Sequence, residues 1–136
     1  EHGPKGGDEL NHIEAGKNYG WPAITYGVDY SGAVISPFTE AEGMEQPLIY
    51  WVPSIGPSGL AIYRGDQFPE WEGDLLLGSL INTEMRRLKL EGDAVTLDEA
   101  IFPEISGRVR DVRVLSDGSI VTVTDEGDVF HITNTP

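Results

Sequence analysis

A strand–turn–strand pattern that occurs twice in the second half of the chain constrains the fold most. The run 73–80 (GDLLLGSL) resembles the run 118–125 (GSIVTVTD), and their first glycines lie 45 residues apart. Another apolar run precedes each copy, and a turn and a further apolar run follow it. A period of roughly 40–50 residues with four strands per unit is typical of a β-propeller blade. We therefore predict an all-β fold that forms part of a propeller, with a β-sandwich as the alternative.

Short apolar runs between turn signals predict the individual strands. A complete four-stranded antiparallel blade is expected within residues 48–103, and an incomplete last blade, without its outer strand, within 104–136. In closed propellers the opposite terminus often supplies that strand. The predicted strands cover residues 48–52, 59–63, 75–80, 85–90, 95–102, 109–115, 119–124 and 129–132.

Residues 1–47 are dominated by glycine and proline and predict a long, ordered loop region. Within it we expect one short strand at 23–26 and a short helical turn at 8–15, closed by Gly16. The whole chain, 1–136, is interpreted as a single partial propeller domain of about two blades that follow this N-terminal region.

The charge of the chain excludes several classes of partner. With 23 acidic and 9 basic residues the formal net charge is −14, which disfavours nucleic acids and anionic membrane surfaces. No apolar run approaches the ~18 residues that a membrane span needs, so we expect no membrane insertion. The sequence has no cysteine, and thiolate chemistry and disulfides are therefore excluded.

An arginine pair opens a predicted innermost strand. Arg108 and Arg110 are two residues apart and should point the same way, whereas Arg113 falls on the opposite face. Two adjacent guanidinium groups repel unless an anion lies between them, which suggests a small polycarboxylate or phosphate ligand. The alternative is a pair of local ion pairs, to Asp111 or Glu104.

A glycine-rich loop near the N-terminus offers oxygen ligands. Asp8 and Glu9 follow closely on Gly3 and Pro4, and hard cations such as calcium bind carboxylates and backbone carbonyls in such loops. The alternative is that Asp8 caps the short helical turn. The histidines are scattered and form no zinc pattern, and His131, on a terminal strand, is expected at the surface.

The loop also carries a motif that resembles a known family. The run 1–11 (EHGPKGGDELN), followed by 16–22 (GKNYGWP), resembles the soluble quinoprotein sugar dehydrogenases of the glucose/sorbosone dehydrogenase family, and the aldose sugar dehydrogenases in particular. The resemblance extends over nearly the whole chain and corresponds to the C-terminal part of the family. Later motifs follow in the same order, at 50–53 (YWVP), 56–59 (GPSG), 73–80 and 108–112 (RVRDV).

This resemblance implies a six-bladed propeller that binds pyrroloquinoline quinone (PQQ) and calcium. The backbone carbonyls of Gly3 and Pro4 correspond to those that hold the calcium contacting the quinone. Glu9 and Tyr19, with Asp8 beside them, correspond to a second, structural calcium position.

The resemblance also implies a set of PQQ contacts. Arg108 and Arg110 correspond to the pair that binds the carboxylates of the cofactor. Glucose-specific members have a lysine at the place of Ile81, so this site carries one positive charge fewer. The other positions implied beside the cofactor are Tyr30, Ser79 and, more loosely, Trp51 and Ser54.

The implied reaction is oxidation of an aldose sugar, with hydride transfer to PQQ and calcium as Lewis acid. The general base of the family is a histidine from an earlier blade, and none of His2, His12 or His131 corresponds to it. We therefore expect this chain by itself to lack the catalytic base and to be inactive.

Two further interpretations remain open. A non-catalytic propeller module that binds or interacts is the main alternative, whereas a glycosidase would need two carboxylates about 5–10 Å apart in a pocket. We expect a periplasmic or secreted location, as in the resembling family. Exposed strand edges of a partial propeller also predict self-association.

Overall fold

The computed structural model describes residues 1–134, which fall into two compact units, 1–56 and 57–134. The described residues form antiparallel sheets of two, four and three strands, with one short 3₁₀ helix, η1 (Pro69–Trp71). The described part contains no helix with the length and apolar character needed to cross a bilayer. The strands are β1 (Asp8–Leu10), β2 (Ile49–Trp51), β3 (Pro57–Ile62), β4 (Leu75–Ser79), β5 (Glu84–Glu91), β6 (Ala94–Ile101), β7 (Val109–Val114), β8 (Ile120–Thr124) and β9 (Val129–Ile132).

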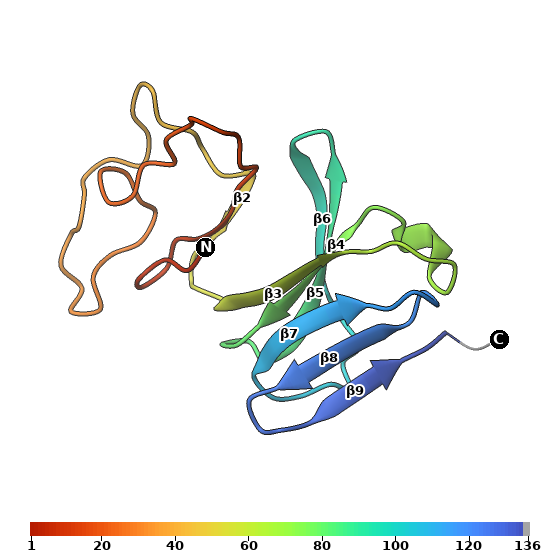
Figure 1. The fold of residues 1–136 in the computed structure, drawn as a ribbon. Coiled ribbons are helices and arrows are strands. Elements are labelled where there is room, and N and C mark those ends of the chain that lie inside the picture. Colours follow the sequence, from red (N-terminus) through yellow and green to blue (C-terminus); the bar gives the residue numbers. More distant parts are fainter. Residues whose placement is uncertain (135–136) are drawn as a thin grey trace. The chain divides into compact units, whose positions relative to one another are not determined.

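The second unit consists of two antiparallel meanders. One sheet has the order β3-β4-β5-β6 and the other the order β7-β8-β9, so that each strand pairs with the next along the chain (Figure 1). This is the arrangement of propeller blades, and it confirms the all-β, propeller-type fold class predicted from the 45-residue repeat. As predicted, the second sheet has no fourth strand within the described residues.

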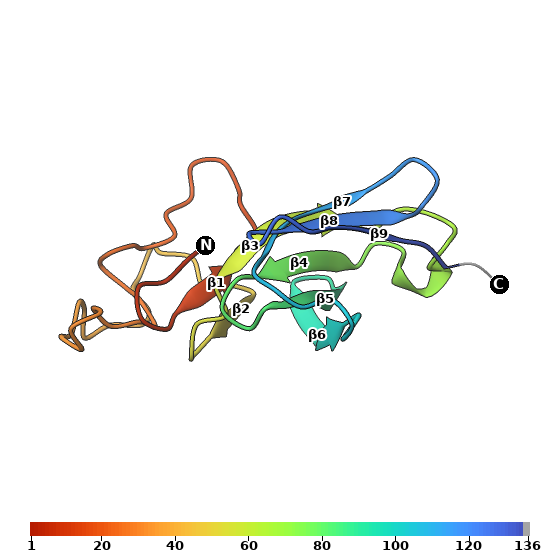
Figure 2. The same cartoon turned by 90° about the horizontal axis from the view of Figure 1, so that it is seen from below.

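The two sheets of this unit pack β3 and β4 against β7, and Figure 2 shows the three-stranded sheet nearly edge-on beside β4. The buried core cluster of this unit contains aliphatic side chains, Met85 and the fully buried Tyr63, and aromatic side chains such as Phe68 and Trp71 pack against it. The close approach of the two sheets requires glycine at two positions. A Cβ on Gly78 would lie 2.8 Å from Cγ1 of Val109, and a Cβ on Gly59 would lie 2.6 Å from Cα of Asp111. The Ser58 hydroxyl donates a 2.6 Å hydrogen bond to the Val109 carbonyl, which joins the two sheets.

A β-bulge changes the alternation of side chains at the start of β7. Val109 pairs with Thr124 and Asp111 with Val123, which leaves Arg110 as the extra residue. Bulges of this kind bend a strand and re-aim its side chains. Here Val109 and Val112 are both fully buried in the core although they are three residues apart, while Arg110 points to solvent.

The first unit is mainly loop, as predicted, but two local predictions were wrong. Residues 8–10 form β1, which pairs with β2, where a helical turn was expected. The expected strand at 23–26 is absent, and the chain there forms turns instead. The backbone of Lys5 pairs with that of Val28 as an isolated bridge, so pairing partners far along the chain override local preference. Because β2 pairs with β1, residues 49–51 belong to this unit rather than to the four-stranded sheet.

Candidate functional site

The arginine pair of the second unit meets on one carboxylate. Arg110 forms a two-pronged interaction with Asp125, from Nε to Oδ1 at 2.8 Å and from Nη2 to Oδ2 at 2.8 Å. Arg108 donates from Nε to Oδ2 of the same residue at 3.1 Å. The two guanidinium groups therefore point together, as predicted, and an anion lies between them.

The structure therefore shows the alternative expected for these arginines, local ion pairs, with Asp125 in place of Asp111 and Glu104. Asp111 pairs instead with Arg113, at 3.1 Å. The hydrogen bonds from Arg110 and Arg108 lower the pKa of Asp125 to about 2, so that its carboxylate remains ionised at neutral pH. A register argument would have found it: Thr124, the residue before Asp125, pairs with Val109 across the β7–β8 ladder.

Arg108 also connects the pair to the turn between β4 and β5. Its Nη1 donates to the carbonyl of Leu80 at 3.4 Å, and its backbone N–H donates to the Glu126 carboxylate at 3.0 Å. Leu80 lies between two predicted cofactor residues, Ser79 and Ile81. The structure thus gathers Ser79, Ile81 and the arginine pair at one end of the sheets.

Ser79 and Ile81 differ strongly in exposure. Ser79 is fully buried, and its hydroxyl accepts a 3.1 Å hydrogen bond from the backbone N–H of Asn82. Ile81 is 57 % exposed, so an uncharged side chain faces solvent at the position where the resemblance implies lysine in glucose-specific members. A cavity of about 380 Å³ adjoins this turn, and Asn82 and Thr83 lie on its wall.

Asp8 occupies the centre of the N-terminal loop. Its carboxylate is 1 % exposed and accepts hydrogen bonds from the backbone N–H groups of Gly3 (2.8 Å), Ile55 (2.8 Å) and Gly56 (2.7 Å). The Ser54 hydroxyl donates a further bond, at 3.1 Å. Since both oxygens already accept hydrogen bonds, Asp8 acts as a buried anchor that closes the loop.

Glu9 lies in a different environment from its neighbour. Its carboxylate is half-buried, and burial raises its pKa above the ordinary value although Asn11 donates a 3.1 Å hydrogen bond to it. The amide oxygen of Asn11 is buried and has no hydrogen-bond partner among the described residues. A desolvated carboxylate beside an unpartnered amide oxygen is a donor set that suits a hard cation.

The hydroxyl of Tyr19 is engaged within the loop. It donates to the carbonyl of His12 at 2.7 Å and accepts from the N–H of Glu14 at 2.7 Å. Among the described residues no group of three or more histidine, cysteine, aspartate or glutamate side chains could hold a metal. A calcium ion in this loop would therefore have to draw on backbone carbonyls together with Glu9.

The remaining predicted residues of the first unit are dispersed. The Tyr30 side chain is 77 % exposed, whereas Trp51 is buried. Ser54 accepts a 2.9 Å hydrogen bond from the N–H of Gly6, in addition to its contact with Asp8. A Cβ on Gly3 would lie 2.5 Å from the carbonyl carbon of Gly7, so the tight loop requires glycine there.

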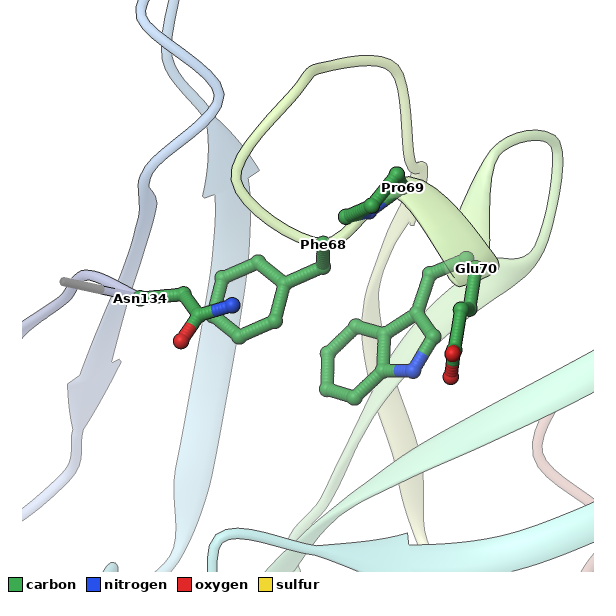
Figure 3. A pocket seen from close by; sticks show the side chains of 5 residues that line it. Phe68, Pro69, Glu70 and Asn134 are labelled. Carbon is green, nitrogen blue, oxygen red and sulfur yellow. The ribbon is translucent and has the colours of Figure 1, made fainter. Parts of the chain in front are cut away.

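A second cavity, of about 440 Å³, surrounds η1 and is lined by none of the predicted site residues. Phe68 and Trp71 lie on its wall, and Figure 3 shows Asn134 beside the Phe68 ring. The two aromatic rings stack at 4.6 Å, and the Arg87 guanidinium lies 5.1 Å from the Trp71 ring centre. Since the indole packs against both Phe68 and Arg87, we interpret this cluster as structural packing.

Comparisons with known proteins agree on one family. The glucose/sorbosone dehydrogenase family model matches residues 1–131. The aldose sugar dehydrogenase YliI of Escherichia coli is 45 % identical over 129 residues, and an uncharacterized protein of Synechocystis is 44 % identical over 129 residues. These matches cover 93–94 % of this chain but only 34 % and 31 % of the two relatives, so the chain spans about a third of their length.

Solved structures give the same result. A glucose dehydrogenase structure is 44 % identical with a TM-score of 0.90, covering 100 % of this chain and 40 % of that one. The soluble aldose sugar dehydrogenase of E. coli, in its apo form, is 40 % identical with a TM-score of 0.91, covering 99 % and 40 %. The PQQ-bound aldose sugar dehydrogenase of Streptomyces coelicolor, at 23 % identity and a TM-score of 0.62, shares the fold over 93 % of this chain and 37 % of that one. From the family model, these relatives and the arrangement of its sheets, this chain belongs to the glucose/sorbosone dehydrogenase family.

Proposed function

We propose that this chain forms part of a PQQ-dependent dehydrogenase that oxidises aldose sugars, with calcium as a second cofactor. The observation that carries the proposal is the convergence of Arg108 and Arg110 on one carboxylate in a chain of this family. Relatives described as glucose and aldose sugar dehydrogenases, one of them PQQ-bound, support the substrate class and the cofactor.

The arginine pair has the chemistry that a polycarboxylate cofactor needs. It already holds the carboxylate of Asp125, and it retains N–H donors directed away from that residue. Guanidinium groups match carboxylates in a two-pronged geometry and neutralise their charge. In this role Arg108 and Arg110 bind and orient PQQ, with Ser79 and Ile81 beside it. From the family resemblance alone, we also assign Tyr30 of the first unit to the cofactor.

The N-terminal loop supplies the oxygen donors for calcium. Carbonyl and carboxylate oxygens are the ligands that calcium prefers. We assign the carbonyls of Gly3 and Pro4 to the calcium of the cofactor, and Glu9, Tyr19 and Asp8 to a second, structural calcium position. Among the side chains of this second position the half-buried Glu9 carboxylate is the main donor, because the oxygens of Asp8 and Tyr19 are already hydrogen-bonded.

When bound, PQQ accepts hydride from the sugar, and calcium polarises its quinone carbonyl. The residues of this chain bind and orient these groups. By the family resemblance, no histidine of this chain corresponds to the general base of the family; the three are His2, His12 and His131. His131, on β9 of the three-stranded sheet, has its Nε2 2.9 Å from the Ser119 hydroxyl. We therefore assign the proton-accepting step to a residue outside this chain.

The experiment is a PQQ titration of the full-length protein that carries this chain. Tryptophan fluorescence reports PQQ binding, and the titration is carried out with and without calcium. Replacing both Arg108 and Arg110 by alanine should weaken PQQ binding by about 10²–10⁴-fold, because each charge-assisted hydrogen bond contributes about 1.5–3 kcal/mol and at least two are lost. Arg113→Ala is the matched control, since this exposed arginine pairs with Asp111 on the same strand. Unchanged binding in the double variant would contradict the proposal.

A second candidate, a non-catalytic propeller module, is favoured by Ile81. This exposed apolar side chain takes the place of the lysine of glucose-specific members. The module would neither bind PQQ nor reduce a dye in the presence of aldoses. The dehydrogenase would bind PQQ and reduce the dye. The same preparation therefore distinguishes the two functions.

The proposal extends to location and assembly. We infer a periplasmic or secreted protein, as the family resemblance implies. The outer edges of β6 and β9 pair with no further strand within the described residues, and such edges favour association with another strand. Self-association of this chain should appear as a dimer or larger species in sedimentation, and a monodisperse monomer would contradict it.

A further inference from the structure

The carboxylate of Asp125 lies between two guanidinium groups that the proposed function assigns to PQQ. It contacts Nε of Arg108 and both Nε and Nη2 of Arg110. We propose that Asp125 is a positioning residue of the cofactor site, which holds the two guanidinium groups together and leaves their outer N–H groups for a carboxylate of the ligand. This inference rests on the proposed function.

The guanidinium nitrogens of Arg108 and Arg110 divide into those that donate a hydrogen bond within the chain and those that do not. Asp125 takes the Nε side of both arginines, and the Leu80 carbonyl takes Nη1 of Arg108. Within the described part of the chain, Nη2 of Arg108 and Nη1 of Arg110 donate no hydrogen bond. A second carboxylate can therefore bind the pair without displacing Asp125.

The backbone fixes the position of this carboxylate. The N–H of Asp125 donates a 2.9 Å hydrogen bond to the carbonyl of Arg108, so the acid and one of its partners are joined by main chain as well as by side chain. The arginine side chains are about half exposed, at 48 % and 54 %, and would otherwise be mobile. Holding such long side chains in advance reduces the conformational entropy that ligand binding has to overcome.

Positioning and simple charge attraction predict opposite results. Removing an acid from the site makes it more positive, and charge attraction alone then predicts tighter binding of a polycarboxylate. If Asp125 positions the arginines, its removal lets two like charges repel and separate, and binding becomes weaker. The sign of the change in affinity therefore tests the inference.

The experiment compares Asp125→Asn with Asp128→Asn in the full-length protein. Both substitutions remove one negative charge from the same hairpin, and no side-chain hydrogen bond or ion pair of Asp128 occurs among the described residues. We expect the dissociation constant for PQQ, from calorimetry, to rise at least about 10-fold in Asp125→Asn, by the loss of roughly one charge-assisted interaction. In Asp128→Asn it should change less than about twofold, as is usual for an exposed charge. Binding by Asp125→Asn as tight as the wild type, or tighter, would overturn the inference.

Two measurements separate the possible failures. If the Arg108 and Arg110 variants bind PQQ like the wild type, the proposed function fails; if they lose binding while Asp125→Asn does not, only this inference fails. NMR of the arginine Nε–H groups in the wild-type protein requires no variant to fold. Slowly exchanging Nε–H signals from both arginines that persist after PQQ is added support the inference, and their loss on PQQ addition would contradict it.

Discussion

The Asp8 carboxylate accepts a 2.7 Å hydrogen bond from the backbone N–H of Gly56, a residue 48 positions later in the chain. The same side chain also binds the N–H groups of Ile55 and Gly3. One buried carboxylate thus closes the N-terminal loop onto the segment that follows β2.

Replacing Asp8 by alanine should destabilise the first unit by about 2–4 kcal/mol, because it leaves several buried N–H groups without an acceptor. Asp8→Asn retains one acceptor oxygen and should cost less. Hydrogen exchange at the Ile55 and Gly56 amides measures the effect directly. Amides that remain equally protected in the alanine variant would show that the carboxylate is dispensable.

Removal of one hydroxyl should destabilise the second unit. The Tyr63 hydroxyl is buried, donates to the Gly118 carbonyl at 2.7 Å and accepts from the Phe68 N–H at 3.0 Å. Tyr63→Phe should lower the free energy of unfolding by about 1–3 kcal/mol, since both partners lose their hydrogen bond. Tyr50→Phe is the control, because this side chain is 46 % exposed and its ring stacks on Tyr26 in either form. Urea denaturation of the two variants should show a clear difference in midpoint.

The contact between the sheets should not tolerate a methyl group. Gly78→Ala would bring a Cβ to 2.8 Å from Val109 Cγ1, and overpacking of this kind costs about 1–3 kcal/mol. Gly92→Ala is a useful comparison: its φ is +61° but the space around it is open, so it reports the backbone cost alone. A thermal midpoint for Gly78→Ala close to that of the wild type would show that the sheets adjust freely.

The acid stability of the second unit should depend on Asp125. The pKa of Asp125 is lowered to about 2 by Arg110 and Arg108, against an ordinary value of 3.8. Its contribution to stability is therefore present above about pH 4 and is lost as the pH falls toward 2. Thermal midpoints of the wild type should fall over this range, and those of Asp125→Asn should fall less. A parallel decline in both proteins would contradict the assignment.

Calcium should stabilise the first unit through Glu9. Burial raises the pKa of this carboxyl, so its ionised form is disfavoured in the fold, and the stability it contributes is lost as the pH rises above the ordinary value of 4.5. In calcium-free buffer at pH 7, Glu9→Gln should be at least as stable as the wild type. Calcium at 100 times its dissociation constant should add about 2.7 kcal/mol to the wild type and less to the variant. An equal response of both proteins would exclude Glu9 as a ligand.

Most of the propeller part could be predicted from the sequence because its strands are local patterns. The runs at 75–80 and 129–132 alternate or are continuously apolar between clear turns, and the structure places strands there. The N-terminal region resisted prediction because its pairings are long-range: β1 pairs with a strand about 40 residues away, and no local signal at 8–10 indicates this. The same reason explains the helical turn wrongly expected at 8–15.

In the candidate site, too, the features set by local sequence could be predicted and those set by pairing between strands could not. The spacing of Arg108 and Arg110 predicted two side chains that point together, and the structure bears this out. Their partner, Asp125, lies across a hairpin, so its identity depended on strand register. The roles of Tyr30, Gly3 and Pro4 toward a cofactor remain predictions.

The extra residue in β7 has a consequence for how this segment tolerates change in evolution. Val109 and Val112 can both face the interior only because Arg110 is inserted between paired positions. A substitution at 110 leaves that phase intact, whereas regular pairing of every residue from 109 to 112 would turn Val109 outward. For the core of this unit, descendants of this chain should therefore conserve the bulge itself more strictly than the residue that occupies it.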